Sequence, residues 1–290
     1  MLQHVILLTL QVSILMTVFG FGLQTRPADV LYLAKRPLLL GRSLAAIFVI
    51  MPIAAVALAS AFELRPSVEI ALVTLSISPI PPLLPGREER AGGHKSYALG
   101  LMAIAGLVSI VTVPATVSIL GRYFMQPFAL SPSAVARIVV VIAIVPLAAG
   151  IAVHATWPSV AVRIAKVVLR VSQVLLGIGV LAIMVRALPA ALALTGNGTI
   201  LVVAAFLTIG LAVGHWLGGP EVDHRTVLAL STACRHPAIA LAIAKANFPD
   251  EPDLGAAIVL VLLLSVIIGI PYQRRQKRLA GRAGRTSSVA

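Results

Sequence analysis

A single arginine lies in the middle of a hydrophobic segment that is long enough to cross a membrane. The segment is 226–248, TVLALSTACRHPAIALAIAKANF, in which Arg235 is followed by His236 and Pro237. Moving an arginine into lipid costs at least ~3 kcal/mol, so we expect this side chain to face protein or water. A guanidinium holds a carboxylate or phosphate through two parallel hydrogen bonds. Arg235 and His236 therefore predict an anion-binding site within the membrane.

Hydroxyl side chains occur beside this interruption and beside another one. The other interruption, which comes first along the chain, is the proline-rich run ISPIPPLLPG, residues 77–86. Hydroxyls can donate hydrogen bonds to an anion. The predicted substrate-binding or translocation residues are Arg235, His236, Ser231, Thr232, Ser78 and Ser76, and the predicted helix breaks are Pro79, Pro81, Pro82 and Pro237.

Arg235 and His236 each have a second interpretation. Arg235 also fits a structural cation that ties unwound backbone carbonyls together, although carbonyls alone would leave a net charge buried. His236 either titrates near neutral pH and couples proton movement to a substrate, or stays a neutral, hydrogen-bonded side chain. These alternatives remain open on the sequence.

Other reactive side chains are few and scattered. Cys234 is the single cysteine, which excludes a Cys-cluster metal site. We interpret it as a small buried residue rather than a thiol for arsenite. The remaining histidines lie at the ends of hydrophobic runs without ligand spacing. We predict no metal and no cofactor, and no enzyme, because no carboxylate pair or nucleophile with a base lies at one depth.

The composition indicates a membrane protein with many spans. Hydrophobic residues make up 59% of the 290 residues and charged residues 11%, against about 25% charged in a soluble domain. The net charge of +13 comes from lysines and arginines between the hydrophobic runs and in the tail after Pro271. This distribution is typical of a topology signal and not of a nucleic-acid groove.

Apolar windows of about 20 residues predict an all-α protein with nine transmembrane helices. The first window lacks a basic n-region and a cleavage site, so we expect it to be retained. We expect PSVAVRIAKVVLR to be an amphipathic stretch before span six, and GREERAGGHK to be a mobile inner loop. The predicted spans are 4–24, 38–60, 67–84, 97–120, 133–155, 165–187, 199–217, 226–247 and 254–272.

The charge distribution also predicts the orientation. Placing the N-terminus outside puts most of the 23 lysines and arginines, including the basic tail 273–290, on the cytoplasmic side. We predict a multi-pass protein of a bacterial cytoplasmic (inner) membrane with an outside N-terminus and a cytoplasmic C-terminus.

The two interrupted spans, three and eight, are five spans apart and so cross the membrane in opposite directions. Spans one to four would then match spans six to nine as an inverted repeat. Paired discontinuous helices of this kind form substrate sites near the bilayer midplane. The pattern predicts a secondary transporter rather than an ordinary helix bundle.

Two segments of the chain, 231–244 and 19–37, resemble the bile acid:sodium symporter family, which is related to the arsenite exporters. Residues 231–236 followed by AIALAIA are similar to that family's crossover helix, and FGFGLQTRPADVLYLAKRP is similar to its first helix end and basic turn. The resemblance implies alternating access between a panel domain of about 1–36 and 133–190 and a core domain of about 37–132 and 191–272, with spans three and eight crossing in the core.

Departures from the family argue against its usual sodium coupling. Ser231 stands where the family has an acidic residue, and Arg235 and His236 stand where it has a Gln-Asn pair. A scan of the acidic residues places all of them in loops or at span ends, with Glu69 as the only marginal sodium ligand. A buried guanidinium also repels a cation.

We therefore predict a small organic anion as the substrate, with a proton as an alternative coupling ion and the lipid bilayer as the other partner. An exporter or uniporter of another solute on the same scaffold, or a transport-inactive paralogue that acts as a sensor, are the rival predictions.

Overall fold

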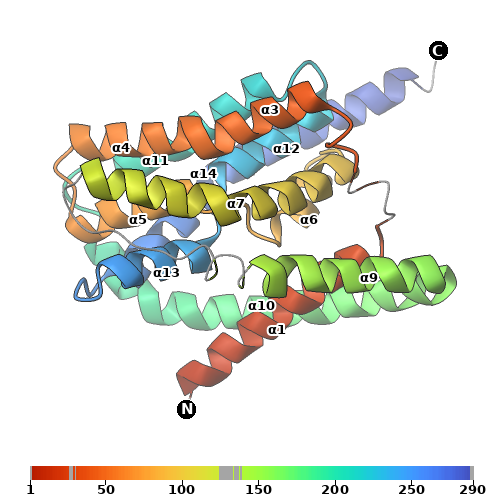
Figure 1. Ribbon diagram of the computed structural model, residues 1–290, viewed down its shortest axis with the longest axis horizontal. Helices are drawn as coiled ribbons and strands as arrows, with labels where there is room; N and C mark the ends of the chain where they lie inside the picture. The colour runs from red at the N-terminus through yellow and green to blue at the C-terminus, as the bar shows by residue number, and fades with distance from the viewer. Residues whose placement is uncertain are drawn as a thin grey trace.

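The computed structural model describes residues 2–25, 31–123 and 139–287, together with Asp29, Ser133 and Arg137. Every regular element in these ranges is a helix (Figure 1). The elements are α1 (Leu2–Gly22), α3 (Pro37–Ala45), the π-helix η1 (Ala46–Ile50), α4 (Met51–Ala61), α5 (Pro66–Ile77), α6 (Leu84–Arg90), α7 (Lys95–Tyr123), the π-helix η2 (Val140–Ile144), α9 (Val145–Thr156), α10 (Pro158–Ala193), α11 (Thr199–Leu217), α12 (Val222–Ala233), α13 (Pro237–Asn247) and α14 (Leu254–Ser287).

Several helices are long and apolar enough to cross a membrane. Shorter apolar helices occupy three more of the predicted windows, at Leu8–Gly22, Pro66–Ile77 and Val140–Thr156. The chain is therefore a multi-pass membrane protein, while nine spans and an inverted repeat remain predictions. The five long segments are Pro37–Ala61, Lys95–Leu120, Thr199–Leu217, Val222–Asn247 and Leu254–Gly281.

One sequence prediction about local structure was wrong, and it concerns residues 86–95. The stretch predicted to be amphipathic before span six lies within α10, which runs unbroken from Pro158 to Ala193. Pro158 sits at the first turn, where its missing N–H has no helical partner to lose. The stretch expected as a loop, GREERAGGHK, begins with the C-terminal part of α6, because Gly86 to Arg90 continue the helix that starts at Leu84.

Helices α1, α9 and α10 pack against one another along one side of the molecule (Figure 1). Helices α1 and α9 approach each other closely at glycines. A Cβ atom on Gly150 would overlap the Phe19 carbonyl oxygen and the Gly22 Cα, so glycine is required where these backbones touch. These three helices belong to the predicted panel domain, and the structure brings them together. The division into panel and core domains itself stays a prediction.

The remaining helices form the larger part of the molecule. One buried cluster joins α4, α5, α11 and α14 through residues such as Met51, Leu72, Phe206 and Val261. A second joins η1, α7 and α12 through Ile47, Leu101 and Leu228, among others. Both clusters enclose the two interrupted helices, so the interruptions lie inside protein.

Gly150→Ala is expected to destabilise the protein by about 1–3 kcal/mol, because the added methyl group overpacks the α1–α9 contact. Gly177→Ala is the matched control, since a Cβ at Gly177 meets no atom within 4 Å and alanine is the better helix former by about 1 kcal/mol. Thermal unfolding in detergent should show a lower Tm for the first variant and an equal or higher Tm for the second. Equal Tm values for both variants would contradict the packing assignment.

Candidate functional site

The first interruption follows from the positions of its prolines. Helix α5 ends at Ile77 because Pro79, Pro81 and Pro82 cannot donate to the carbonyls four residues before them. The Leu75 carbonyl, deprived of Pro79, accepts instead from the backbone N–H of Ser78 at 3.1 Å and from its hydroxyl at 2.8 Å. The Ser78 carbonyl, deprived of Pro82, is left for a partner from elsewhere in the chain.

The second interruption supplies donors to the first. Cys234 and His236 have extended backbone conformations between α12 and α13. The His236 N–H donates to the Pro79 carbonyl at 2.9 Å. Helix α5 contacts α13 while α6 contacts α12, so the two interrupted segments run antiparallel and meet where both are unwound. Each unwound backbone is thereby shielded from lipid, as a membrane interior requires.

Arg235 joins a third segment to this meeting point. Its Nη1 donates to the Ser78 carbonyl at 3.3 Å and its Nη2 to the Ile47 carbonyl at 2.8 Å. Ile47 lies in the π-helix η1, in which the Met51 N–H donates to the Ala46 carbonyl five residues earlier. The same pattern would pair the Ile47 carbonyl with Pro52, which has no N–H. The guanidinium, only 2% exposed, thus satisfies two carbonyls that prolines have released.

The Arg235 side chain is incompletely satisfied. Its Nε has no hydrogen-bond partner, and no carboxylate of a described residue forms an ion pair with it. The two contacts with carbonyls have the form of the structural cation that the sequence offered as an alternative. Within the described part of the chain, the Nε–H has no acceptor, and the net charge of the guanidinium is not neutralised. A buried cation of this kind favours an anion nearby.

The four predicted hydroxyl residues lie around the interruptions, but each hydroxyl now donates its hydrogen bond to another group of the protein. Ser76, Ser78 and Thr232 donate to carbonyls of their own helices, at 2.6, 2.8 and 2.6 Å. Ser231 donates to the Oε1 of Glu88 at 2.6 Å. No hydroxyl of the four hydrogen-bonds to Arg235.

His236 is buried, 5% exposed, and caps α13. Its Nδ1 accepts from the Ile239 N–H at 3.4 Å, which places the ring proton on Nε2 in the neutral tautomer. His236 also lines a crevice with Pro79, Pro82, Met102 and Ala143. This crevice lies between the interruptions, α7 and η2, and its wall is otherwise apolar.

Glu88 is a buried carboxyl that the sequence scan misplaced. The scan put it in an exposed loop, but its exposed fraction is 0%, because α6 folds against α12. Ser231 satisfies Oε1, whereas Oε2 has no partner. Burial raises the pKa of Glu88 to about 8, against smaller opposing effects of the Ser231 hydrogen bond and of Arg87. In the sequence, Glu88 stands just after Pro85 and Gly86, at the end of the proline-rich run, and this position was the available signal. No sequence pattern distinguishes an acidic residue that becomes buried from an exposed one.

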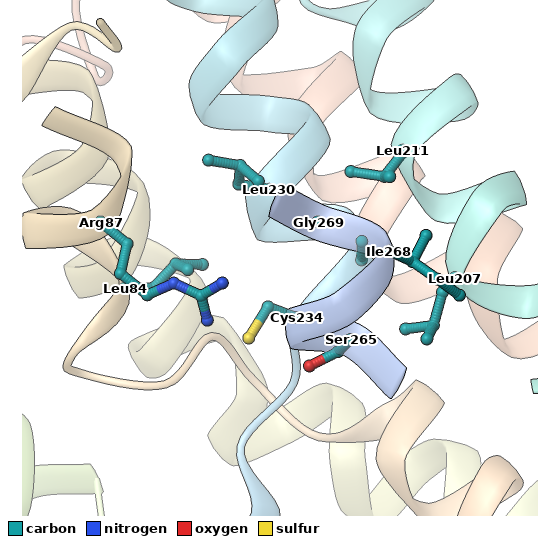
Figure 2. Close-up of a pocket in the computed structure, with 10 residues that line it drawn as sticks. Leu84, Arg87, Leu207, Leu211, Leu230, Cys234, Ser265, Ile268 and Gly269 are labelled. Atoms are coloured by element: carbon teal, nitrogen blue, oxygen red, sulfur yellow. The ribbon is translucent and has the colours of Figure 1, made fainter. Parts of the chain in front are cut away.

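Arg87 and Cys234 face each other across a small cavity between α6, α12, α11 and α14. Figure 2 shows the guanidinium of Arg87 extending from α6 toward the Cys234 sulfur, with Ser265 on α14 beside it. The cavity wall is otherwise mainly leucine and isoleucine. Cys234 is thus a partly buried residue of the second interruption. No group of three metal-ligating side chains occurs in the described chain.

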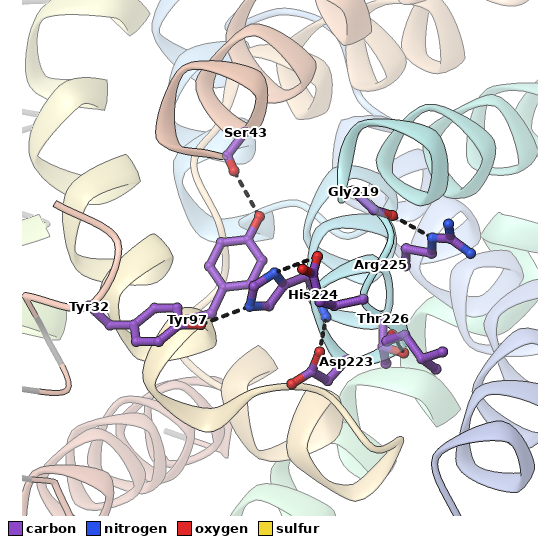
Figure 3. A network of polar contacts seen from close by, with 10 residues as sticks. Tyr32, Ser43, Tyr97, Gly219, Asp223, His224, Arg225 and Thr226 are labelled. Atoms are coloured by element: carbon purple, nitrogen blue, oxygen red, sulfur yellow. Dashed lines mark hydrogen bonds and ion pairs between the residues drawn. The ribbon is translucent and has the colours of Figure 1, made fainter. Parts of the chain in front are cut away.

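Two histidines that seemed scattered lie together at one end of the helices. Tyr32 stacks on His94 at 4.3 Å between ring centres, and its hydroxyl lies 2.8 Å from His224 Nε2 (Figure 3). His224 also lies 3.4 Å from Glu221. Burial raises the pKa of Tyr32 and lowers that of His94. The segments that carry these residues, two loops and the first turn of α12, therefore meet.

Comparison with known protein families identifies the family of this chain. The model of the sodium bile acid symporter family matches residues 11–192, which is more than half of the chain. The chain belongs to the sodium bile acid symporter family. It is therefore a membrane transporter of the bile acid symporter kind. A comparison with curated protein sequences gives no match.

The match to the family model covers only part of the candidate site. The match includes the first interruption with Ser78 and Pro79, and also Glu88, but it ends before α11. For this member of the sodium bile acid symporter family, the arrangement around Arg235 rests on the structure alone.

The stability of the protein is expected to fall as the pH rises from about 4.5, the ordinary pKa of Glu88, to about 8, its pKa in the fold. Over this range the unfolded chain releases the Glu88 proton while the folded chain retains it. Glu88→Gln should remove this part of the pH dependence, on the order of a few kcal/mol. Thermal unfolding at a series of pH values measures the difference.

The control is Glu89→Gln, which changes the exposed neighbour of Glu88 and should leave the wild-type pH dependence in place. The comparison concerns the slope with pH, because the glutamine amide also changes the absolute stability. Parallel curves for Glu88→Gln and wild type would show that Glu88 is ionised in the fold.

Proposed function

We propose that this transporter moves a small organic anion by alternating access and is not coupled to sodium in the usual manner of its family. The observation that carries the proposal is the guanidinium of Arg235, which is buried where two interrupted helices meet and has no carboxylate partner among the described residues. Family membership supports the transport function.

The charge of the site supports an anion. Two backbone carbonyls neutralise a guanidinium only partly, and the unpartnered Nε of Arg235 is a donor for one more acceptor. A carboxylate or sulfonate would complete the hydrogen bonds and cancel the charge. A sodium ion in the same place would be repelled strongly at low dielectric.

The crevice beside the interruptions supports an organic substrate. Its wall contains Pro79, Met102, Ile142 and Ile239, with His236 as the polar group. An anion with a hydrocarbon body would bury that body against this wall. On this proposal, Ser231, Thr232, Ser78 and Ser76 exchange their present acceptors for substrate oxygens when the interruptions separate.

Movement between two helix groups would provide the access. Val139, Ile142 and Ala143 line one side of the crevice, and the interruptions line the other. Displacement of α1, η2, α9 and α10 against the remaining helices would therefore open or close the crevice. Glycine contacts between α1 and α9 favour motion of these helices as one body.

The proposal predicts that Arg235→Gln abolishes anion binding. Purified protein is screened by thermal shift with taurocholate, propanesulfonate and pyruvate, with and without sodium and at two pH values, and the anion that stabilises it is used for uptake into proteoliposomes. Loss of the charged hydrogen bonds should weaken binding at least about tenfold. Arg235→Lys should be intermediate, since it keeps the charge and loses the fork.

Arg186→Gln, at an exposed arginine of α10, is the matched control and should transport like the wild type. Unchanged uptake by Arg235→Gln would overturn the anion site. Stabilisation by an anion without any uptake would favour a sensor instead of a transporter.

A further inference from the structure

Glu88 is the one carboxyl in the described chain that is fully buried. No described lysine or arginine forms an ion pair with it. Its Oε1 accepts from Ser231 and its Oε2 has no partner. A carboxylate left in this state is costly, whereas a proton on Oε2 removes the charge. The burial pattern therefore fits the acid form.

We propose that Glu88 binds the proton to which transport is coupled, with Oε2 taking the proton from water on one side of the membrane and releasing it to water on the other. This inference rests on the proposed function, since it names the coupling ion of the same transporter. It uses a residue that lies outside the predicted anion site.

The surroundings of Glu88 permit its proton affinity to change with conformation. Ser231 and Cys234 face it from α12 and the second interruption, Arg87 from its own helix and Tyr97 from α7. Helix α6 is short, is followed by a turn at Gly92 with φ +90°, and contacts α12. Separation of α6 from α12 would break the Ser231 hydrogen bond and admit water. Hydration stabilises the carboxylate, so the proton would then leave.

Electrostatics links this proton to the anion. Without substrate, the charges of Arg235 and an ionised Glu88 have opposite signs. An anion at Arg235 adds one negative charge four residues from Ser231, which holds Glu88. A proton on Glu88 then restores neutrality in a region of low dielectric. Binding of each species therefore favours binding of the other by the same factor.

His236 is the other buried titratable group at the interruptions, and it suits the role less well. Its Nδ1 already accepts from the Ile239 N–H, so protonation there would break a helix cap. Of the two alternatives for His236 on the sequence, a neutral, hydrogen-bonded side chain fits this geometry, and the proton is better placed on Glu88.

Infrared spectroscopy of the purified protein tests the proton site without a substrate. The wild type near neutral pH should show a protonated-carboxyl C=O band that shifts in deuterated water and is lost in Glu88→Gln but not in Glu89→Gln. Absence of this band in the wild type, or its persistence in Glu88→Gln, would overturn the proposal whether or not the protein transports anions.

Proteoliposomes test the coupling. Taurocholate, propanesulfonate and pyruvate stay ionised from about pH 5 to about pH 9, so their own titration does not interfere. An inward proton gradient should raise wild-type and Glu89→Gln uptake of the anion that binds. In Glu88→Gln the ratio of gradient-driven uptake to counterflow exchange should fall at least about tenfold, because exchange moves no net proton.

A Glu88→Gln variant that still responds fully to the gradient would overturn the coupling. Absence of wild-type exchange for all three anions would count against the proposed function, and the infrared band would still decide whether Glu88 holds a proton. Failure of the coupling and failure of the transport function therefore give different results.

Discussion

The structure depends on an exchange of hydrogen bonds between segments that prolines have unwound. Pro82 and Pro52 leave the carbonyls of Ser78 and Ile47 without their helical donors, and the guanidinium of Arg235 supplies donors in their place. The backbone N–H of His236 donates to the Pro79 carbonyl in the same unwound segment. In lipid, none of these groups would have water as a substitute. The interrupted helices are therefore stable only against each other, which fixes where they cross and keeps that crossing polar.

The interrupted helices form a polar crossing inside an apolar bundle, so the charges at the crossing limit what can bind there. Arg235 brings a cation that carbonyls neutralise only partly, and Glu88 brings an acid whose ionised form is costly. Arg235 lies in the second interruption, and Glu88 accepts a hydrogen bond from Ser231, near the end of the helix α12 that leads into it. Any substrate charge at the crossing must be balanced by these groups. The same constraint that stabilises the interruptions thus limits which solutes and ions the site can accept.

The sequence by itself determined the class of this protein. Apolar windows, an arginine inside one of them and two interruptions that contain proline were sufficient to predict an all-helical membrane transporter. The resemblance of two segments indicated the bile acid:sodium symporter family, to which the chain belongs. These features are local, since hydrophobicity and proline act within a few residues of their positions. They also located the interruptions correctly, at Ser78 and at Cys234 to His236.

Only the tertiary structure decided which side chains share the interior. Glu88 has the sequence environment of an exposed loop residue, yet the packing of α6 on α12 buries it against Ser231, 143 residues away. The contacts of Arg235 with Ile47 and Ser78, and of Tyr32 with His94 and His224, also join parts of the chain that are distant in the sequence. Residue type gives the charge that a group can carry, but burial and partners set its protonation and its role, and both depend on which helices pack together.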